Sequence, residues 1–284
     1  MKFLVLGSTG MAGHVITLYL KEQGHDVIAF SRNPFPYCKN IIGDVTDAGF
    51  VVKMLEETEF DVVINCIGVL NQFAEREPAN AVYLNGYLPH LIADTLKNTN
   101  KRLIHMSTDC VFSGKTGNYG EDSFRDGETF YDRTKALGEV VDDKNLTFRN
   151  SIIGPDIAPN GIGLFNWFMK QDGAINGYVS AVWTGVTTIT LAKAMEAAAK
   201  ENLTGLYHLV NNETINKFEL TSLFNKYFKD NRIKIIPSEV VSLDKSLVNH
   251  RKDFTFKVPS YEEMTIEMRA WVDAHKSLYP HYAL

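Results

Sequence analysis

The sequence predicts an α/β protein, with a doubly wound parallel sheet in the N-terminal half and a smaller α/β substrate-binding cap in the C-terminal half. Three observations predict it. A short apolar run at 2–6 leads directly into a glycine-rich turn and then a helix pattern. Further apolar runs alternate with helix patterns up to residue 153, which is typical of a Rossmann-like sheet. Beyond that residue the alternation becomes irregular. We therefore expect a first domain over 1–153 and a cap over 154–284, with the helix over 187–200 packing back on the sheet.

Each predicted element rests on a hydrophobic pattern and on its boundary residues. Short runs rich in Val, Ile and Phe indicate buried strands, and apolar residues three and four apart indicate amphipathic helices. Ser260 and Glu263 form a capping box that opens the last helix. Strands are expected at 2–6, 26–30, 41–47, 62–66, 102–106, 146–153, 205–210 and 233–236. Helices are expected after the glycine turn to about 23, then at 78–98, 131–141, 187–200, 217–229 and 261–275, with loops and short helices around a pocket at 154–186.

Composition excludes several classes of function. The chain has 284 residues, with 29 Lys and Arg against 34 Asp and Glu and a net charge of −5. Because these charges form no basic block, a nucleic-acid-binding face is not expected. No run approaches ~18 apolar residues, so we expect a cytoplasmic protein without a membrane segment. Cys38, Cys66 and Cys110 have neither metal-ligand spacing nor an even number for disulfides, and no metal is expected.

The glycine turn after the first strand predicts a dinucleotide site. Glycines at positions 7, 10 and 13 let the chain turn sharply, let the backbone approach a pyrophosphate and let the helix pack on the strand. The start of the helix then offers free N–H groups to the phosphates. A simple tight turn is the alternative, but the position of the glycines directly after a strand favours a cofactor-binding site. The predicted contacts are Gly7, Ser8, Thr9, Gly10, Met11, Ala12 and Gly13.

The ends of the next strands predict which nicotinamide cofactor binds. An acid after the second strand would bind the ribose 2′-hydroxyl, whereas this chain has Ser31 and Arg32, which favour a 2′-phosphate and hence NADP, with NAD as the alternative. Asp44 could accept a hydrogen bond from the adenine amino group, while Asp47 is expected to cap a helix. Further cofactor contacts are expected at Val45, Cys66, Ile67, Gly68 and Asn85, the last being either part of a proton relay or a buried packing residue.

Three side chains predict redox chemistry at the end of the fifth strand. Thr108 follows that strand, and Tyr131 and Lys135 lie one turn apart on the next helix. A tyrosine can protonate a ketone oxygen that receives a hydride if a nearby cation tunes its pKa, and a hydroxyl can hold the same oxygen. A pair of residues on a helix surface is the alternative for Tyr131 and Lys135. Cys110 is expected to be a packed, inert thiol instead of a nucleophile.

With these residues in place, the chain resembles the extended short-chain dehydrogenase/reductase family, and within it the dTDP-4-dehydrorhamnose reductase-like branch. The resemblance rests on a linked set of segments across nearly the whole chain. They are the glycine turn, Ser107-Thr108-Asp109-x-Val111-Phe112-x-Gly114, Tyr119-x-Glu121-Asp122, Tyr131-x-x-x-Lys135-x-x-Gly138-Glu139, Arg149-x-Ser151 and Gly205-Leu206-Tyr207-His208.

The resemblance implies hydride transfer from NADPH to the C4 keto group of a nucleotide-linked 6-deoxy-4-hexulose, for cell-surface polysaccharide synthesis. Thr108, Tyr131 and Lys135 match the family's catalytic residues, with Tyr131 also at the cofactor and Lys135 holding the nicotinamide ribose. A homodimer is compatible with it. An epimerase or dehydratase of the same superfamily is an alternative, although Asp109 lacks the adjacent Glu that a dehydratase needs. A catalytically idle NADP-binding regulatory subunit, like the partner of methionine adenosyltransferase, is another.

The substrate contacts are expected around the same strand end and in the cap. This chain has Cys110 where the branch usually has tyrosine, and Ile152 where it usually has tryptophan, so two aromatics expected near the sugar are missing. The identity of the sugar nucleotide therefore stays open between dTDP-linked and UDP-linked compounds. The predicted substrate residues are Asp109, Val111, Phe112, Ile152, Asn166 and Trp183.

Overall fold

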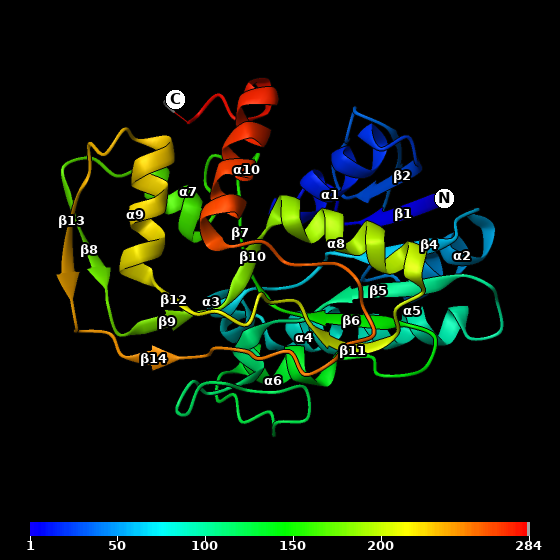
Figure 1. Ribbon diagram of the computed structural model, residues 1–284. Coiled ribbons are helices and arrows are strands. Elements are labelled where there is room, and N and C mark those ends of the chain that lie inside the picture. The colour runs from blue at the N-terminus through cyan, green and yellow to red at the C-terminus, as the bar shows by residue number, and fades with distance from the viewer. Residues whose placement is uncertain (283–284) are drawn as a thin grey trace.

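The computed structural model describes residues 1–282 and contains a central sheet of seven strands within that range (Figure 1). The sheet is formed by β1 (Lys2–Leu6), β2 (Asp26–Ser31), β3 (Lys39–Ile42), β4 (Val62–Asn65), β5 (Arg102–Met106), β6 (Leu146–Arg149) and β11 (Gly205–His208). The spatial order is β11-β6-β5-β4-β1-β2-β3, and every pairing is parallel. The expected Rossmann-like sheet is confirmed. The strand order reverses between β1 and β4, where open α/β sheets bind ligands at the carboxyl ends of the strands.

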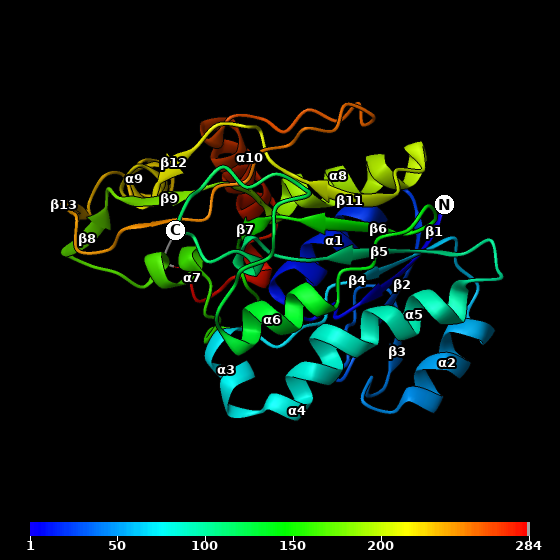
Figure 2. The same ribbon diagram turned by 90° about the horizontal axis from the view of Figure 1, so that it is seen from below.

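Helices cover both faces of this sheet (Figure 2). Helices α1 (Met11–Glu22) and α8 (Thr188–Glu201) pack together on one face, with α10 (Tyr261–Ala274) against α8. Helices α2 (Ala48–Glu57), α5 (Leu88–Leu96) and α6 (Phe130–Leu137) lie on the other. Strand β1 shows why both faces are apolar: Phe3 and Val5 belong to the core on the α1 side, and Leu4 and Leu6 belong to the core on the α2 side.

The helix expected over 78–98 is divided into three parts. It begins as α4 (Pro78–Ala81), widens into a π-helical turn η1 (Val82–Tyr87), and continues as α5. A short helix, α3 (Asn71–Arg76), precedes it. A π-helical turn inserts an extra residue and often marks a functional segment. It places Asn85 opposite α6, the helix that carries Tyr131 and Lys135.

The chain after residue 153 forms the smaller lobe and also contributes to the large sheet. Its other elements are α7 (Leu164–Met169), β8 (Ala174–Tyr178), β9 (Ala181–Trp183), β10 (Gly185–Thr187), β12 (Ile215–Asn216), α9 (Lys217–Phe228), β13 (Lys234–Ser238), β14 (Leu243–Asp244) and the 3₁₀ turn η3 (Lys276–Leu278). Strand β13 pairs with β8, and β9 pairs with β12 and β14. Because β11 and α8 join the central sheet and its cover, the division at residue 153 stays a prediction about folding units.

The expected strand over 146–153 is wrong as one element. It breaks at Asn150 into β6, which stays in the central sheet, and β7 (Ser151–Ile153), which leaves it to pair with β10. Both halves are apolar and β-prone, so the sequence pattern gives no sign of the break. The expected third strand is also displaced: β3 ends at Ile42, and the Asp47 carboxylate accepts a hydrogen bond from Phe50 N at 3.0 Å as the cap of α2.

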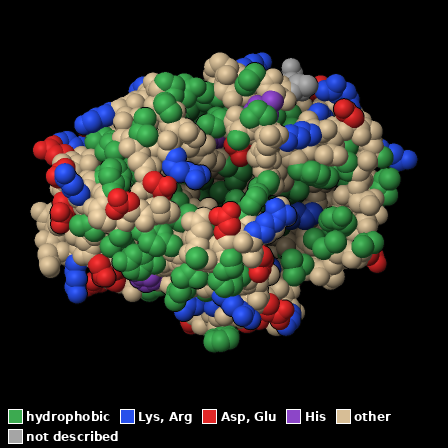
Figure 3. All heavy atoms as spheres, turned by 180° about the vertical axis from the view of Figure 1, so that it is seen from behind, with side chains coloured by type: hydrophobic (Ala, Val, Ile, Leu, Met, Phe, Trp, Pro, Cys, Tyr) green, Lys and Arg blue, Asp and Glu red, His purple; other side chains and the backbone are tan. Residues whose placement is uncertain are grey.

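Two features of the whole molecule bear on its partners. Within residues 1–282, no helix has both the length and the apolar character needed to cross a bilayer. On the face drawn in Figure 3, acidic and basic side chains are interspersed among uncharged ones. This distribution agrees with the absence of a basic block in the sequence.

Candidate active site

The glycine turn has the geometry that a phosphate-binding loop requires. Gly7 has a φ of +84°, a conformation that L side chains rarely adopt. Gly13 packs so closely on the turn that a Cβ atom there would collide with the carbonyl oxygen of Gly7. Helix α1 begins after Gly10, and within the described residues no side chain caps the N-terminus of this helix. Its first N–H groups are therefore available to an anionic ligand.

Two adjoining cavities run along the carboxyl ends of the strands. One has a volume of about 460 Å³ and lies between the glycine turn and the ends of β2, β3 and β4. The other has a volume of about 420 Å³ and lies between the glycine turn, the end of β5 and helix α6. Both are lined by Gly10, Cys66, Ile67 and Gly68. Together they form an elongated groove across the switch point of the sheet, which suits a dinucleotide.

Most of the predicted cofactor residues line this groove. The first cavity is lined by Gly7, Thr9, Ser31, Arg32, Asp44 and Val45, and the second by Met11, Ala12, Tyr131 and Lys135, in addition to the four shared residues. Arg32 and Asp44 thus lie in the same cavity, as expected for the adenosine end. Hydrogen bonds from Thr46 hold the pKa of the Asp44 carboxyl below its ordinary value.

Three predicted cofactor residues line neither cavity. Ser8 is buried, and its hydroxyl donates to Phe30 O at 3.2 Å. Gly13 is covered by the turn itself. The Asn85 side chain accepts from Val69 N at 2.8 Å and donates to Val69 O at 2.9 Å, so its amide fastens the loop after β4 to η1. Of the two readings of Asn85, this geometry favours the packing residue.

Thr108, Tyr131 and Lys135 converge on the second cavity. Thr108 caps the 3₁₀ turn η2 (Asp109–Val111), because its hydroxyl accepts from Cys110 N at 3.1 Å. The same hydroxyl donates to Asp109 Oδ1 at 3.1 Å, and both Thr108 and Tyr131 line the cavity. Thr129 and Asp132 form the capping box that starts α6 and thereby fixes Tyr131 at its first turn.

Burial controls the protonation of the two titratable groups. Burial raises the pKa of the Tyr131 phenol well above its ordinary value, so the phenol is protonated at neutral pH but is a weaker acid than a free tyrosine, and the tuning by a nearby cation that the sequence predicts is not seen in the described part of the chain. Burial lowers the pKa of Lys135 to about 8, although Glu139 and Cys66 act in the opposite direction. The Lys135 amine donates to Met106 O at 2.7 Å, which ties α6 to the end of β5. Cys110, whose pKa burial raises to about 12, has the character of an inert thiol.

A buried ion pair behind the site joins the elements that carry these side chains. The Glu139 carboxylate follows α6 and accepts from the Arg149 guanidinium twice, with Nε at 2.8 Å and Nη2 at 2.6 Å. It also accepts from Ser107 Oγ at 2.6 Å and from Arg125 Nη1 at 3.0 Å. Arg149 Nη1 lies 2.8 Å from His208 Nε2, so β11 is joined as well. We call Ser107, Arg125, Glu139, Arg149 and His208 the Glu139 cluster.

The Glu139 cluster was missed as a functional unit by the sequence analysis. Burial alone would raise the pKa of Glu139, but the Arg149 hydrogen bonds and charge hold it below its ordinary value, so the carboxylate stays ionised. The signal in the sequence is a charged residue, Arg149, at the end of an apolar strand, because a cation in that position needs a buried partner. The sequence could not say which acid that partner is.

Only part of the predicted substrate set lines the second cavity. Asp109 and Ile152 do, together with Asn150, Ser151, Asp156 and Leu164, which the sequence analysis missed. The remaining four predicted residues are packed in the core. Val111 is fully buried, Phe112 stacks on Tyr119 with ring centroids 4.2 Å apart, Asn166 Nδ2 donates to Gly161 O at 2.6 Å, and Trp183 packs against Tyr261.

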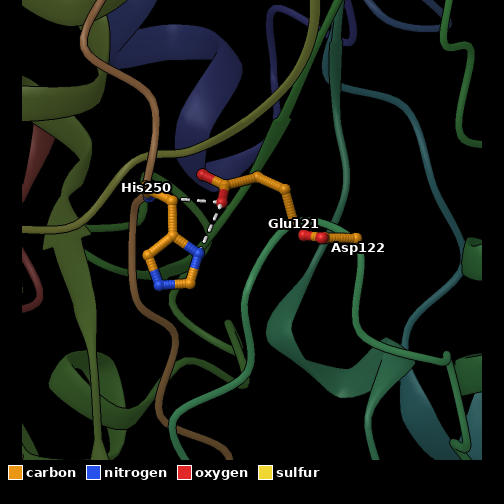
Figure 4. A group of neighbouring side chains, drawn as sticks. All are labelled: Glu121, Asp122 and His250. Atoms are coloured by element: carbon orange, nitrogen blue, oxygen red, sulfur yellow. Dashed lines mark hydrogen bonds and ion pairs between the residues drawn. The ribbon is translucent and has the colours of Figure 1, made fainter.

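A separate group of Glu121, Asp122 and His250 has the composition of a metal site (Figure 4). The Glu121 carboxylate accepts from the backbone N of His208 at 3.4 Å and of His250 at 3.3 Å, and His250 Nδ1 lies 3.8 Å from it. These contacts account for the position of Glu121 as a link between the loop after β5 and the chain after β14. The three residues line neither cavity of the groove.

Comparisons with known proteins point in the same direction as the geometry. The family model described as "RmlD substrate binding domain" matches residues 1–153. A protein of Haloferax volcanii named "Probable low-salt glycan biosynthesis reductase Agl14" is 34% identical over 139 residues, which cover 48% of this chain and 46% of that protein. The dTDP-4-dehydrorhamnose reductase of Streptomyces griseus is 29% identical over 223 residues, which cover 74% of this chain and 70% of that protein.

A solved structure has the same fold. The dTDP-4-dehydrorhamnose reductase of Bacillus anthracis in complex with NADP superposes with a TM-score of 0.80 at 19% identity, covering 95% of this chain and 99% of that one. The chain spans about half the length of several curated relatives that it matches, between 46% and 51%. The family model covers more than half of this chain, and so the chain belongs to the RmlD substrate binding domain family.

Proposed function

We propose that this protein is an NADPH-dependent reductase of a nucleotide-linked 4-keto-6-deoxy sugar that supplies cell-surface polysaccharide synthesis. The observation that carries the proposal is the convergence of Thr108, Tyr131 and Lys135 on a cavity that adjoins a dinucleotide groove. A hydroxyl, a protonated phenol and an amine around one small volume are the groups that ketone reduction requires.

Features along the groove support NADP binding. The uncapped start of α1 faces the place where the pyrophosphate would lie, and the φ of +84° at Gly7 lets the backbone approach it. Arg32 lines the cavity at the other end of the groove, where the ribose 2′-phosphate of NADP would lie. Lys135 and Tyr131 line the nicotinamide end. The nicotinamide, when bound, supplies the hydride.

The residues of this chain then perform the remaining steps. With substrate bound, the Thr108 hydroxyl, which here donates to Asp109 Oδ1 at 3.1 Å, would turn to donate to the C4 keto oxygen, and the Tyr131 phenol would bind the same oxygen. Reduction of the C4 carbon would place negative charge on the oxygen, and Tyr131 would transfer its proton there to give the alcohol. Lys135 would hold the nicotinamide ribose and, when protonated, would favour the phenolate that Tyr131 becomes.

Two other functions fit parts of the structure. An epimerase of the same superfamily would keep NAD bound and recycle it, but Arg32 in the adenosine cavity favours NADP. A catalytically idle NADP-binding subunit would need the groove but not these three side chains, whereas here Thr108, Tyr131 and Lys135 all line the cavity that adjoins it. We also propose that the protein is cytoplasmic, and a homodimer is compatible with the proposed function.

The test is NADPH oxidation, followed by loss of its absorbance, with a panel of dTDP-linked and UDP-linked 4-keto-6-deoxy sugars. We expect turnover with at least one of them and weaker activity with NADH. Interconversion of sugar nucleotides without net NADPH consumption, by protein that releases NAD on denaturation, would indicate the epimerase. Tight NADPH binding without turnover of any sugar would indicate the idle subunit.

A further inference from the structure

A buried chain of polar groups lies behind Lys135, on the side away from the cavity. It consists of Asn65 at the end of β4 and His105 in β5, and both side chains are fully buried. Asn65 Nδ2 lies 3.3 Å from His105 Nδ1, and His105 Nε2 lies 3.5 Å from Lys135 Nζ. Neighbouring parallel strands pair Asn65 with His105 in register, so the chain is built into the sheet.

The hydrogens of this chain can be assigned from one fixed end. The backbone N–H of Ile67 donates to Asn65 Oδ1 at 3.1 Å, and this contact sets the orientation of the amide. The Asn65 NH₂ group must then donate to His105 Nδ1, which accepts. A neutral imidazole that accepts at Nδ1 carries its proton on Nε2. That N–H points at the Lys135 nitrogen.

This arrangement lowers the proton affinity of Lys135, although with a pKa of about 8 the ammonium is still the main form at neutral pH. An ammonium would set its own N–H groups against the Nε2–H of His105, whereas a neutral amine can accept that hydrogen while still donating to Met106 O. Glu139 and Cys66 favour the ammonium, and the protonated Tyr131 phenol lines the same cavity as the amine. His90 on α5 acts on His105 and disfavours an imidazolium there.

We propose that Asn65 and His105 are positioning residues that act through Lys135: they hold its amine by a directed hydrogen-bond relay and set its proton affinity. The relay begins at the Ile67 backbone, which lines the cofactor groove, and ends at the amine, which lines the nicotinamide end. The relay therefore connects the cofactor groove at Ile67 with the Lys135 amine. This inference rests on the proposed function only for its effect on catalysis, because the hydrogen-bond directions follow from the fold alone.

The first experiment uses the wild-type protein and needs no substrate. Histidine labelled with ¹⁵N is incorporated, and long-range ¹H–¹⁵N spectra identify the tautomer of each ring. The spectrum of His105→Gln identifies the signal of residue 105 by its loss. We expect the neutral tautomer protonated at Nε2 from neutral to mildly acidic pH. A ring protonated at Nδ1, or at both nitrogens, at neutral pH would overturn the proposal.

The second experiment reverses the relay. In Asn65→Asp the carboxylate can only accept, so His105 must donate from Nδ1, and Nε2 becomes an acceptor for the Lys135 ammonium. In His105→Gln the amide oxygen can reach the place of Nε2 and accept in the same way. Both variants should raise the pKa of Lys135 by about one unit or more. It is measured by competitive amine labelling over pH with mass spectrometry, using exposed Lys53 as the internal reference.

A matched control and a double variant separate a relay from a plain charge effect. Asn225→Asp introduces a carboxylate at a buried amide of α9 and should leave the pKa of Lys135 unchanged. The shift caused by Asn65→Asp should shrink in the His105→Gln background, since the imidazole transmits it. Unchanged Lys135 titration in both single variants, or a shift that is fully retained in the double variant, would overturn the relay.

The same variants give a catalytic readout. The high-pH limb of kcat/KM, where Lys135 loses its proton, should move upward with the pKa measured by labelling. A merely structural role would lower activity at all pH values without moving that limb. If the protein reduces no keto sugar, the labelling and tautomer results still decide the relay, so its failure is distinguishable from the failure of the proposed function.

Discussion

Replacing Glu139 by Gln removes the charge at the centre of the Glu139 cluster with little change of shape. The Glu139 side chain is fully buried and Arg149 is 1% exposed, so the variant leaves a guanidinium in the interior without its counter-ion. Breaking a buried ion pair on one side costs about 3–5 kcal/mol. For a chain of 284 residues, with an unfolding entropy of ~2.1 cal/mol/K per residue, the melting temperature should fall by roughly 5–8 °C.

The same substitution should also reduce turnover. Glu139 joins Ser107, the neighbour of Thr108, to the end of α6, the helix that carries Tyr131 and Lys135. Melting is followed by circular dichroism, and turnover is measured below the new melting temperature. Arg125→Gln is the matched control: it removes a contact to the same carboxylate from a side chain that is 44% exposed, and should cost under ~1 kcal/mol. Equal melting temperatures for Glu139→Gln and wild type would refute the claim that the Glu139 carboxylate stabilises the Glu139 cluster.

Three further predictions follow from the groove and the core. Arg32→Ala should weaken NADPH binding much more than NADH binding by titration calorimetry, and equal losses would mean that Arg32 does not read the 2′-phosphate. Gly13→Ala should abolish binding of both cofactors, since its Cβ collides with Gly7 O; unchanged dissociation constants would contradict the close packing. Burial lowers the pKa of His14 and of His208 from 6.5 to about 4. The unfolded chain therefore binds more protons between these values, and stability, measured by urea unfolding, should fall as pH decreases from about 6.5 to 4 by a few kcal/mol at most per histidine. A flat profile over that window would contradict neutral buried rings.

The sheet and the glycine turn could be predicted because their signals are local. An apolar run, a turn that needs positive φ and the helix that follows occupy one short segment, and the strand at Arg102–Met106 agrees with its expected bounds. The break at Asn150 could not be predicted, since it depends on the pairing of β7 with β10, which lies more than 30 residues later. The π-helical turn around Asn85 packs against α6, which is distant in sequence, and no local pattern indicates it.

In the candidate site too, local patterns predict some residues, and contacts between distant segments determine the others. Thr108, Tyr131 and Lys135 were placed by spacing and by their position after strands, and the structure brings them to one cavity. The Glu139 cluster and the Asn65–His105 relay join residues from different strands, so no local pattern reveals their partners. For Phe112 and Trp183 the sequence predicts ligand contacts, whereas in the structure Phe112 stacks on Tyr119 and Trp183 packs against Tyr261.

The central claim is that the Tyr131 phenol gives the proton to the substrate oxygen. It is tested by comparing NADPH oxidation by Tyr131→Phe and by wild type, with NADPH affinity measured in parallel by fluorescence. The phenyl ring keeps the packing and loses only the acid, so kcat should fall by roughly 10²-fold or more while the dissociation constant for NADPH stays within about twofold. A Tyr131→Phe enzyme that turns over at the wild-type rate would contradict the account.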